Sequence, residues 1–330
     1  MKAEKPIIET DKEPGAPHPR ETFSFIGHEA EEQALADALS GARMHHAWLI
    51  AGAKGLGKAT LAYRFARAAL GARRTGARPL DVDPEDPVAR KVAALSHPDL
   101  FVLRRGVNDR GKARREIAVD DARELGGFFA LAPSQGGMRI AVIDAVDDLN
   151  PNSANAILKT LEEPPARSVL LLVCHAPGAA LATIRSRCRR LALRPLSDDA
   201  VRGALGGGDE ALVRLAKGRP GRALALKAQG VDGGRLEAAL GAFQRGDSRA
   251  ALNQLYDQMN GEPFEKLAGV LELAGEWTRA AGVESASEAW AEAWSTLETL
   301  RTEAEGLDMD PRHALARAVG VLDRAAGARR

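Results

Sequence analysis

The sequence of 330 residues contains few cysteines, few aromatic residues and no long apolar run. Its two cysteines, Cys174 and Cys188, are too few for a disulfide framework or an all-cysteine zinc site. We therefore expect a reducing, cytoplasmic environment. Aromatic residues make up 4% of the chain, which leaves little material for stacking single-stranded nucleic acid. The longest aliphatic run, residues 169–173, is far shorter than the roughly 18 residues of a membrane span, so we expect no membrane association.

An excess of charge of one sign is also missing. Lys and Arg total 46 and Asp and Glu total 45, so the formal net charge is +1. This balance excludes a protein that binds nucleic acid through bulk positive charge, although it allows a local basic surface. The length corresponds to about two domains, which can bury a core without disulfide or metal support.

Apolar strands alternate with helical segments in the first part of the chain. The strands are apolar on both faces, which predicts an α/β fold with a parallel sheet covered by helices. No strand pattern returns after Pro195. We predict a disordered arm at 1–20, a sheet domain at 21–195, a small helical lid at 196–232 and a helical C-terminal domain at 233–330.

A glycine-rich loop lies between a predicted strand and a predicted helix, and it reads Gly52-Ala-Lys-Gly55-Leu-Gly57-Lys58-Ala59. Glycines let backbone N–H groups surround a phosphate, and a lysine neutralises the outer phosphates. The pattern predicts a P-loop fold. Its last position, which normally supplies a hydroxyl to magnesium, is Ala59, and Thr60 comes one residue too late.

Asp144 ends the apolar strand where the second carboxylate of a P-loop site is expected. The neighbouring position, which holds a water-polarising glutamate in hydrolysing ATPases, is Ala145. We interpret Asp147 and Asp148 as N-terminal caps of the following helix. Because the positions for magnesium binding and water activation are both alanine, the sequence argues against ATP hydrolysis.

A basic cluster surrounds Ser186-Arg187-Cys188 and contains Arg185, Arg187, Arg189 and Arg190. Composition alone favours a solvated face or an internal ion pair. The alternative is an arginine finger that reaches the phosphates of a neighbouring subunit.

These motifs together resemble bacterial clamp-loader subunits of the AAA+ class. The specific pairing is Ser186-Arg187-Cys188 about twenty residues after Asn152-Ser-Ala-Asn155-Ala-Ile-Leu-Lys159-Thr-Leu-Glu162-Glu163-Pro164-Pro165. The chain looks more like the delta-prime branch of this family than like its gamma/tau motor branch, because the motor keeps both hydrolytic groups. The resemblance implies an AAA+ P-loop module with a helical lid, followed by an all-α collar that joins the chain to other subunits.

The resemblance also implies a function. This subunit would be a non-hydrolysing stator that supplies Arg187 in trans to a gamma/tau motor subunit. Its other partners would be the delta subunit, the sliding clamp and primer–template DNA. Gly52, Gly55, Gly57, Lys58, Thr60 and Asp144 would form a degenerate nucleotide site that binds ATP weakly or not at all. The zinc module common in the family is not expected, since residues 70–97 contain no cysteine.

Two alternative functions and one open question about a loop remain at this point. An active gamma/tau-like ATPase motor would need Thr60, Asp147 or Asp148 to replace the missing groups. A small-molecule kinase would need an acceptor pocket, and the long helical C-terminal half argues against it. The loop 110–115 is basic and could touch DNA, although a solvated hairpin is the preferred interpretation.

Overall fold

The computed structural model describes residues 9–12, 16–41, 44–108, 113–134, 137–176, 178, 180–244, 247, 250, 253–255, 274–275, 288–307 and 309–327. Contacts divide the chain into two compact units. The first contains Met1–Glu13 and Pro17–Leu196, and the second contains Pro14–Ala16 and Ser197–Arg330.

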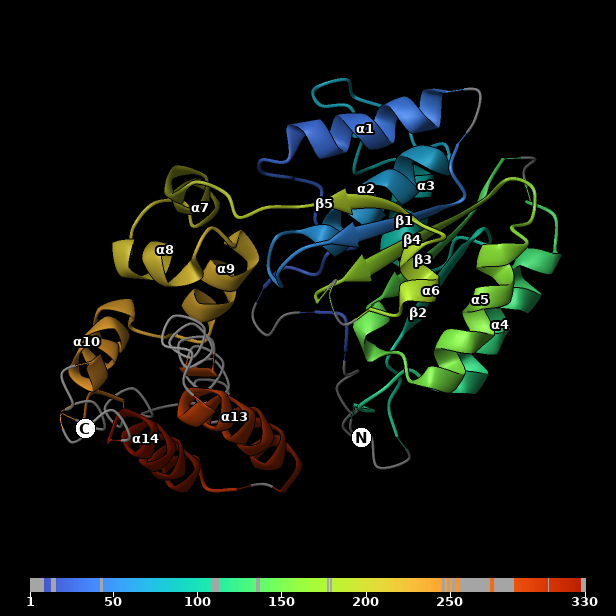
Figure 1. Ribbon diagram of the computed structural model, residues 1–330. Helices are drawn as coiled ribbons and strands as arrows, with labels where there is room; N and C mark the ends of the chain where they lie inside the picture. The colour runs from blue at the N-terminus through green and yellow to red at the C-terminus, as the bar shows by residue number, and fades with distance from the viewer. Residues whose placement is uncertain are drawn as a thin grey trace, which may run out of the picture. The chain divides into compact units, whose positions relative to one another are not determined.

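A five-stranded parallel sheet forms the centre of the first unit (Figure 1). Its strands are β1 (Ala47–Ala51), β2 (Leu100–Arg104), β3 (Arg139–Asp144), β4 (Ser168–Cys174) and β5 (Arg189–Ala192). They lie in the order β2-β3-β4-β1-β5. All strands are parallel, so their carboxyl ends meet at one edge of the sheet.

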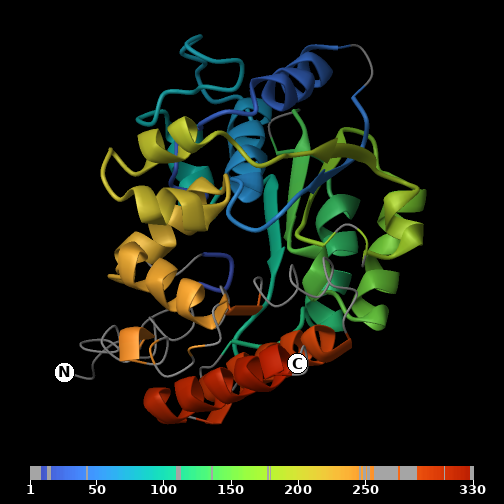
Figure 2. The ribbon, with the colours of Figure 1, turned by 60° about the vertical axis from the view of Figure 1, so that its left-hand side comes forward.

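Helices cover both faces of the sheet, with α1, α2 and α3 on one face and α4 and α5 on the other (Figures 1 and 2). The helical elements of this unit are α1 (Glu29–Ser40), α2 (Lys58–Ala69), α3 (Pro87–Ala93), α4 (Val119–Ala130), the short 3-10 helix η1 (Val146–Asp148), α5 (Pro151–Glu162) and α6 (Ala182–Arg185). Strand side chains alternate between two cores. Trp48 and Ile50 pack with α1 and α2, whereas Ala47 and Leu49 pack with α4 and α5. The strands are apolar throughout because both of their faces are buried.

The N-terminal segment differs from the disordered arm predicted for residues 1–20. In its described part, Asp11 is buried and forms an ion pair with Arg104 of β2, and Glu9 forms one with Arg20. His18 is also buried, with its ring 3.5 Å from the Asp11 carboxylate. These charged residues suggest disorder when read locally, but Glu9 has a partner within the segment and Asp11 has one on β2, which is distant in the sequence.

The second unit is helical. Its described helices are α7 (Asp198–Ala204), α8 (Glu210–Ala216), α9 (Pro220–Ala228), α10 (Gly233–Gln244), α13 (Glu288–Leu307) and α14 (Pro311–Gly327). One apolar core contains Val201 and Leu226 together with Leu236, Leu297 and Leu322. Residues on both sides of the predicted lid–collar boundary therefore share a core. The prediction that 196–232 and 233–330 are separate domains stays a prediction, and residues 256–273 and 276–287 of the second of these ranges lie outside the described residues.

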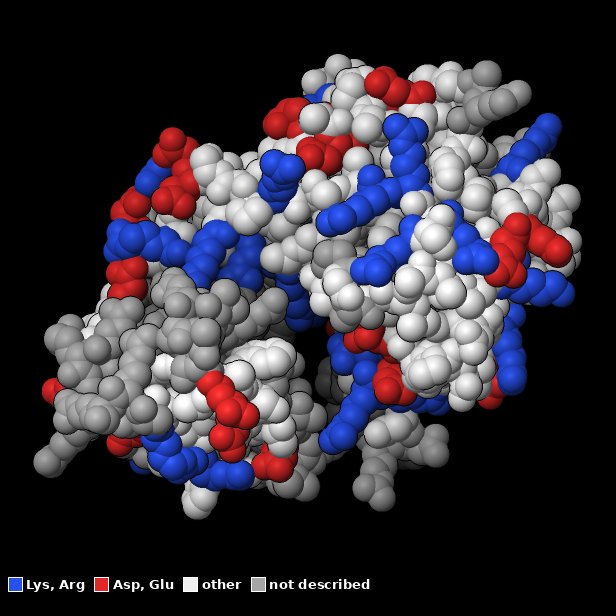
Figure 3. All heavy atoms as spheres, in the orientation of Figure 1, with Lys and Arg blue, Asp and Glu red and all other residues white. Residues whose placement is uncertain are grey.

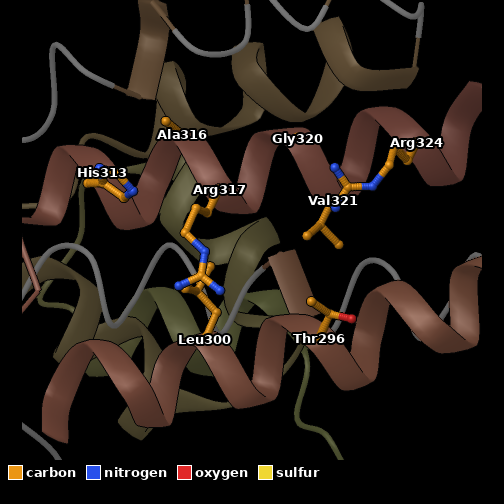
Figure 4. A pocket seen from close by; sticks show the side chains of 8 residues that line it. All are labelled: Thr296, Leu300, His313, Ala316, Arg317, Gly320, Val321 and Arg324. Carbon is orange, nitrogen blue, oxygen red and sulfur yellow. The ribbon is translucent and has the colours of Figure 1, made fainter. Parts of the chain in front are cut away.

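Helices α13 and α14 enclose a groove of about 450 Å³ (Figure 4). Arg317 of α14 extends toward Leu300 of α13 in this view, and its guanidinium lies 3.3 Å from the Glu303 carboxylate. The ion pair thus links the two helices beside the groove.

The predicted α/β fold with a helical second part is confirmed. No helix in the described ranges is both long and apolar enough to cross a membrane.

Candidate nucleotide site and arginine cluster

The glycine-rich loop connects β1 to α2, as the sequence predicts. Gly52, Gly55 and Gly57 all have positive φ angles. A Cβ atom at Gly52 would lie 2.5 Å from the Leu193 carbonyl oxygen, and one at Gly57 would lie 3.0 Å from the Phe25 ring. Only glycine fits this backbone, so the loop can present its N–H groups to a phosphate at the start of α2.

Lys58 is the first residue of α2 and is buried. Its Nζ donates a hydrogen bond to the Ala53 carbonyl oxygen at 2.7 Å, within its own loop. The next two positions of α2, Ala59 and Thr60, are both half-buried. The loop can therefore cradle a phosphate, but the position of the magnesium-binding hydroxyl carries a methyl group. The residues present fit a phosphate group and do not fit the usual P-loop magnesium ion.

Asp144 ends β3, and β4 separates that strand from β1. Its carboxylate is buried, and this burial together with the negative charge of Asp11 raises the pKa of Asp144 to about 7. The positive charges of Lys58 and Lys54 act in the opposite direction. Asp144 is therefore within electrostatic range of the loop lysines, and its burial makes the carboxyl group a much weaker acid than an exposed aspartate. Its neighbour Ala145 is also buried and offers no polar group.

His175 is a residue of this site that sequence reasoning missed. It directly follows β4, the strand between the loop strand β1 and the Asp144 strand β3. Burial, followed by the charges of Lys58, Lys54 and Arg105, lowers the pKa of His175 to about 3, so the ring is neutral. Its position after a buried strand was visible in the sequence, but its closeness to the lysines depends on the strand order.

The capping role predicted for Asp147 and Asp148 is wrong. Asn150 caps α5 instead, because its side chain accepts hydrogen bonds from the backbone N–H groups of Asn152 and Ser153. The Asp147 carboxylate accepts hydrogen bonds from the N–H groups of His175 and Ala176, at 2.6 and 2.7 Å. It therefore ties η1 to the end of β4.

Asp148 has a different partner, since its carboxylate lies 3.1 Å from the Arg105 guanidinium. Neither carboxylate is thus available to replace the water-polarising glutamate that hydrolysing ATPases carry at the position of Ala145. Among the residues that the structure describes, no group of three or more His, Cys, Asp or Glu side chains could hold a metal ion.

Arg187 lies between α6 and β5, and its guanidinium has three oxygen neighbours. It forms an ion pair with Glu162 at 2.7 Å and donates to the Thr183 carbonyl oxygen at 2.9 Å and to the Ser186 hydroxyl at 3.3 Å. The internal ion pair that composition favoured is therefore present. The Arg187 side chain is still 34% exposed, so the guanidinium also reaches the surface.

Other arginines surround this position. Arg189 and Arg190 are exposed on β5, the edge strand of the sheet, and Arg189 stacks over the Trp48 ring at 4.8 Å. Lys and Arg side chains gather over β5 and α6 on the face seen in Figure 3. Exposed charges on an edge strand also prevent pairing with strands of other chains. The basic surface surrounds the Ser186–Cys188 motif.

Comparisons with known proteins agree on one family. A family model described as "DNA polymerase III, delta subunit" matches residues 27–197, just over half of the chain. The delta' subunit of DNA polymerase III from Pseudomonas aeruginosa is 33% identical over 250 residues, which cover 72% of each chain. The delta' subunit from Escherichia coli is 32% identical over 58% of this chain and 57% of that protein. The tau/gamma subunit from Haemophilus influenzae is 30% identical over 80% of this chain and 40% of that protein.

Proposed function

Because the chain belongs to the family of DNA polymerase III delta' subunits, we propose that it is a non-hydrolysing subunit of a bacterial clamp loader. The observation on which this rests is the state of the nucleotide site. The phosphate-binding loop keeps its glycines and lysine, but both positions needed for hydrolysis are alanine, Ala59 and Ala145. The subunit acts as a stator, and its cellular location is the cytoplasm.

The contacts of the site support this proposal. Lys58 donates a hydrogen bond to the Ala53 carbonyl oxygen within its own loop, and Ala59 offers no hydroxyl group to a magnesium ion. The site binds ATP weakly at most and does not turn it over. No cofactor is required, and zinc has no part in the function.

Arg187 differs from Lys58 because its side chain reaches the protein surface. It lies within the basic cluster, on the segment that connects α6 to β5. We assign it as an arginine finger that completes the ATP site of an adjacent gamma/tau motor subunit. The remaining partners are the delta subunit, the sliding clamp and primer–template DNA. The second unit, with its helical core, provides the collar contacts.

The test is a loader reconstituted with the full chain as wild type or Arg187→Ala. We expect DNA- and clamp-stimulated ATP hydrolysis to fall by a factor on the order of 10³ at the motor-subunit site that Arg187 completes, with the assembly intact. Arg123→Ala is the matched control, because Arg123 on α4 is 68% exposed and pairs with Asp120. An unchanged rate in Arg187→Ala would contradict the finger.

The alternative is an active motor subunit. It predicts ATP turnover by the isolated chain at about one per second, abolished by Lys58→Ala. Our proposal predicts no turnover. The partners found for Asp147 and Asp148 favour our proposal, because both carboxylates are engaged elsewhere.

A further inference from the structure

The ion pair between Glu162 and Arg187 connects the two motifs that distinguish this sequence. Glu162 is the last residue of α5, and Arg187 follows α6. Their Oε1 and Nη2 atoms are 2.7 Å apart, and the two side chains are 49% and 34% exposed. The pair is therefore well formed but half open to solvent.

The position of Glu162 is unfavourable by itself. Carbonyl groups at the end of a helix carry partial negative charge, so a carboxylate there is disfavoured and a cation is preferred. Glu163 caps α5 and Pro164 follows it, so two acidic residues stand at the helix end, where the last turn holds one basic residue, Lys159. A local sequence that violates the preference of a helix end is typical of a functional position.

Arg187 compensates for this charge. Its guanidinium stands among the other arginines of the cluster, which would repel a freely moving cation. Glu162, the Thr183 carbonyl and the Ser186 hydroxyl hold it on one side. These three contacts use at most three of the five guanidinium N–H donors, so the others can reach an oxygen of another molecule.

The supports of this arrangement are rigid. Leu161, next to Glu162, and Ile184 of α6 are buried in the same apolar core, and Cys188, next to Arg187, packs against it. The distance between the two backbone positions is thus set by a packed core and not by a mobile loop. A side chain held by such a frame loses less entropy when it binds a ligand.

We propose that Glu162 is a positioning residue for Arg187: it holds the guanidinium so that its remaining donors can receive a phosphate of a nucleotide bound to a neighbouring subunit. This inference rests on the proposed function, in which Arg187 acts in trans. Glu162 does not touch the nucleotide. It acts by limiting the conformations of the arginine before the neighbour arrives.

The experiment compares four variants in the reconstituted loader: Glu162→Gln, Glu163→Gln, Arg187→Ala and the double variant Glu162→Gln/Arg187→Ala. Glutamine keeps the shape of glutamate and removes its charge. Glu163 is the matched control, because it is exposed and its carboxylate makes no hydrogen bond or ion pair within the described part of the chain. Stimulated ATP hydrolysis is measured, and size-exclusion chromatography verifies assembly.

We expect Glu162→Gln to lower the stimulated kcat about three- to fivefold, as fits an exposed ion pair, and Glu163→Gln to leave it unchanged. In the Arg187→Ala background, Glu162→Gln is expected to have no further effect. A purely structural role would lower the rate in both backgrounds, so this double-mutant cycle isolates the action of Glu162 through Arg187.

Each other outcome has a distinct meaning. If Arg187→Ala leaves the rate unchanged, the trans role of Arg187 fails, and the positioning role of Glu162, which depends on it, fails as well. If Arg187→Ala lowers the rate but Glu162→Gln does not, only the positioning role is overturned. A higher rate in Glu162→Gln would overturn it as well, because the glutamate would then restrain the arginine. An equal loss in both backgrounds would reduce Glu162 to a structural residue and also overturn the inference.

Discussion

Replacing Asp144 by asparagine is expected to stabilise the sheet unit at neutral and alkaline pH. The buried carboxyl group has a pKa of about 7, compared with an ordinary value of 3.8. One pKa unit corresponds to about 1.36 kcal/mol, so this difference of about three units corresponds to about 4 kcal/mol. The folded state binds the Asp144 proton more tightly than the unfolded state does.

The sign of the effect follows from this difference. As the pH rises from about 4 to about 7, the unfolded chain releases the proton before the folded chain does, and the folded protein loses stability. Above pH 7 the loss is complete and constant. In Asp144→Asn this loss is removed. The variant should therefore gain about 4 kcal/mol relative to wild type between pH 4 and pH 8.

Amide hydrogen exchange of β3 and β4 peptides measures the opening of the sheet separately from the helical unit. The quantity to compare is the difference between variant and wild type at each pH, because other groups such as His175 titrate in both proteins. Asp120→Asn is the control, since the Asp120 side chain is 84% exposed, and it should change the free energy of unfolding by less than about 0.5 kcal/mol. An Asp144→Asn difference that stays within about 1 kcal/mol from pH 4 to pH 8 would refute the burial argument.

Three further predictions concern contacts within the sheet unit. Gly57→Ala should destabilise the sheet unit by about 2 kcal/mol, because Gly57 has a positive φ and an added Cβ would meet the Phe25 ring. Gly71 also has a positive φ but faces open space, so Gly71→Ala should cost about 1 kcal/mol. Thermal unfolding compares the two variants, and equal costs would refute the steric contribution of the ring. Glu32→Gln should lower the free energy of unfolding in urea by about 3 kcal/mol or more, since it breaks the buried ion pairs with Arg64 and Arg78. Glu29 is exposed and pairs with Arg78 at the surface, so Glu29→Gln should cost less than about 1 kcal/mol. Similar costs for the two variants would contradict the role of burial. Asp147→Asn should lower the free energy of unfolding by about 1–3 kcal/mol and speed the amide exchange of His175 and Ala176, because an amide group replaces one of the two accepting oxygens. Unchanged exchange at these two positions would argue against the hydrogen-bonded link between η1 and the end of β4.

Local sequence predicted the elements that depend on near neighbours. The strand, glycine loop and helix around Gly52 and Lys58 appear where expected, because positive φ angles, apolar runs and helix starts are encoded within a few residues. The α/β class also followed from local patterns, since strands that are apolar on both faces need helices on both sides. Asp144 was placed correctly at a strand end for the same reason.

The failures concern interactions between distant segments. The described part of residues 1–20 is ordered because Asp11 and Glu9 meet Arg104 and Arg20, and the first of these partners is distant in sequence. Asp147 was assigned to the nearest helix, but its partners lie beyond the next strand. Both differences arise because the partners of these charged groups cannot be read from the neighbouring residues.

The sequence by itself determined the glycine-rich loop, the alanines at positions 59 and 145 and the arginine cluster, since each is a property of residue types at short spacing. Only the tertiary structure decided which groups lie near one another and how burial changes their pKa values. The order β3-β4-β1 brings His175 and Asp144 to the loop lysines, and burial sets their pKa values. The packing of α5 and α6 on one core brings Glu162 to Arg187. Strand order and helix packing are long-range outcomes of burying apolar surface, and no short segment encodes them.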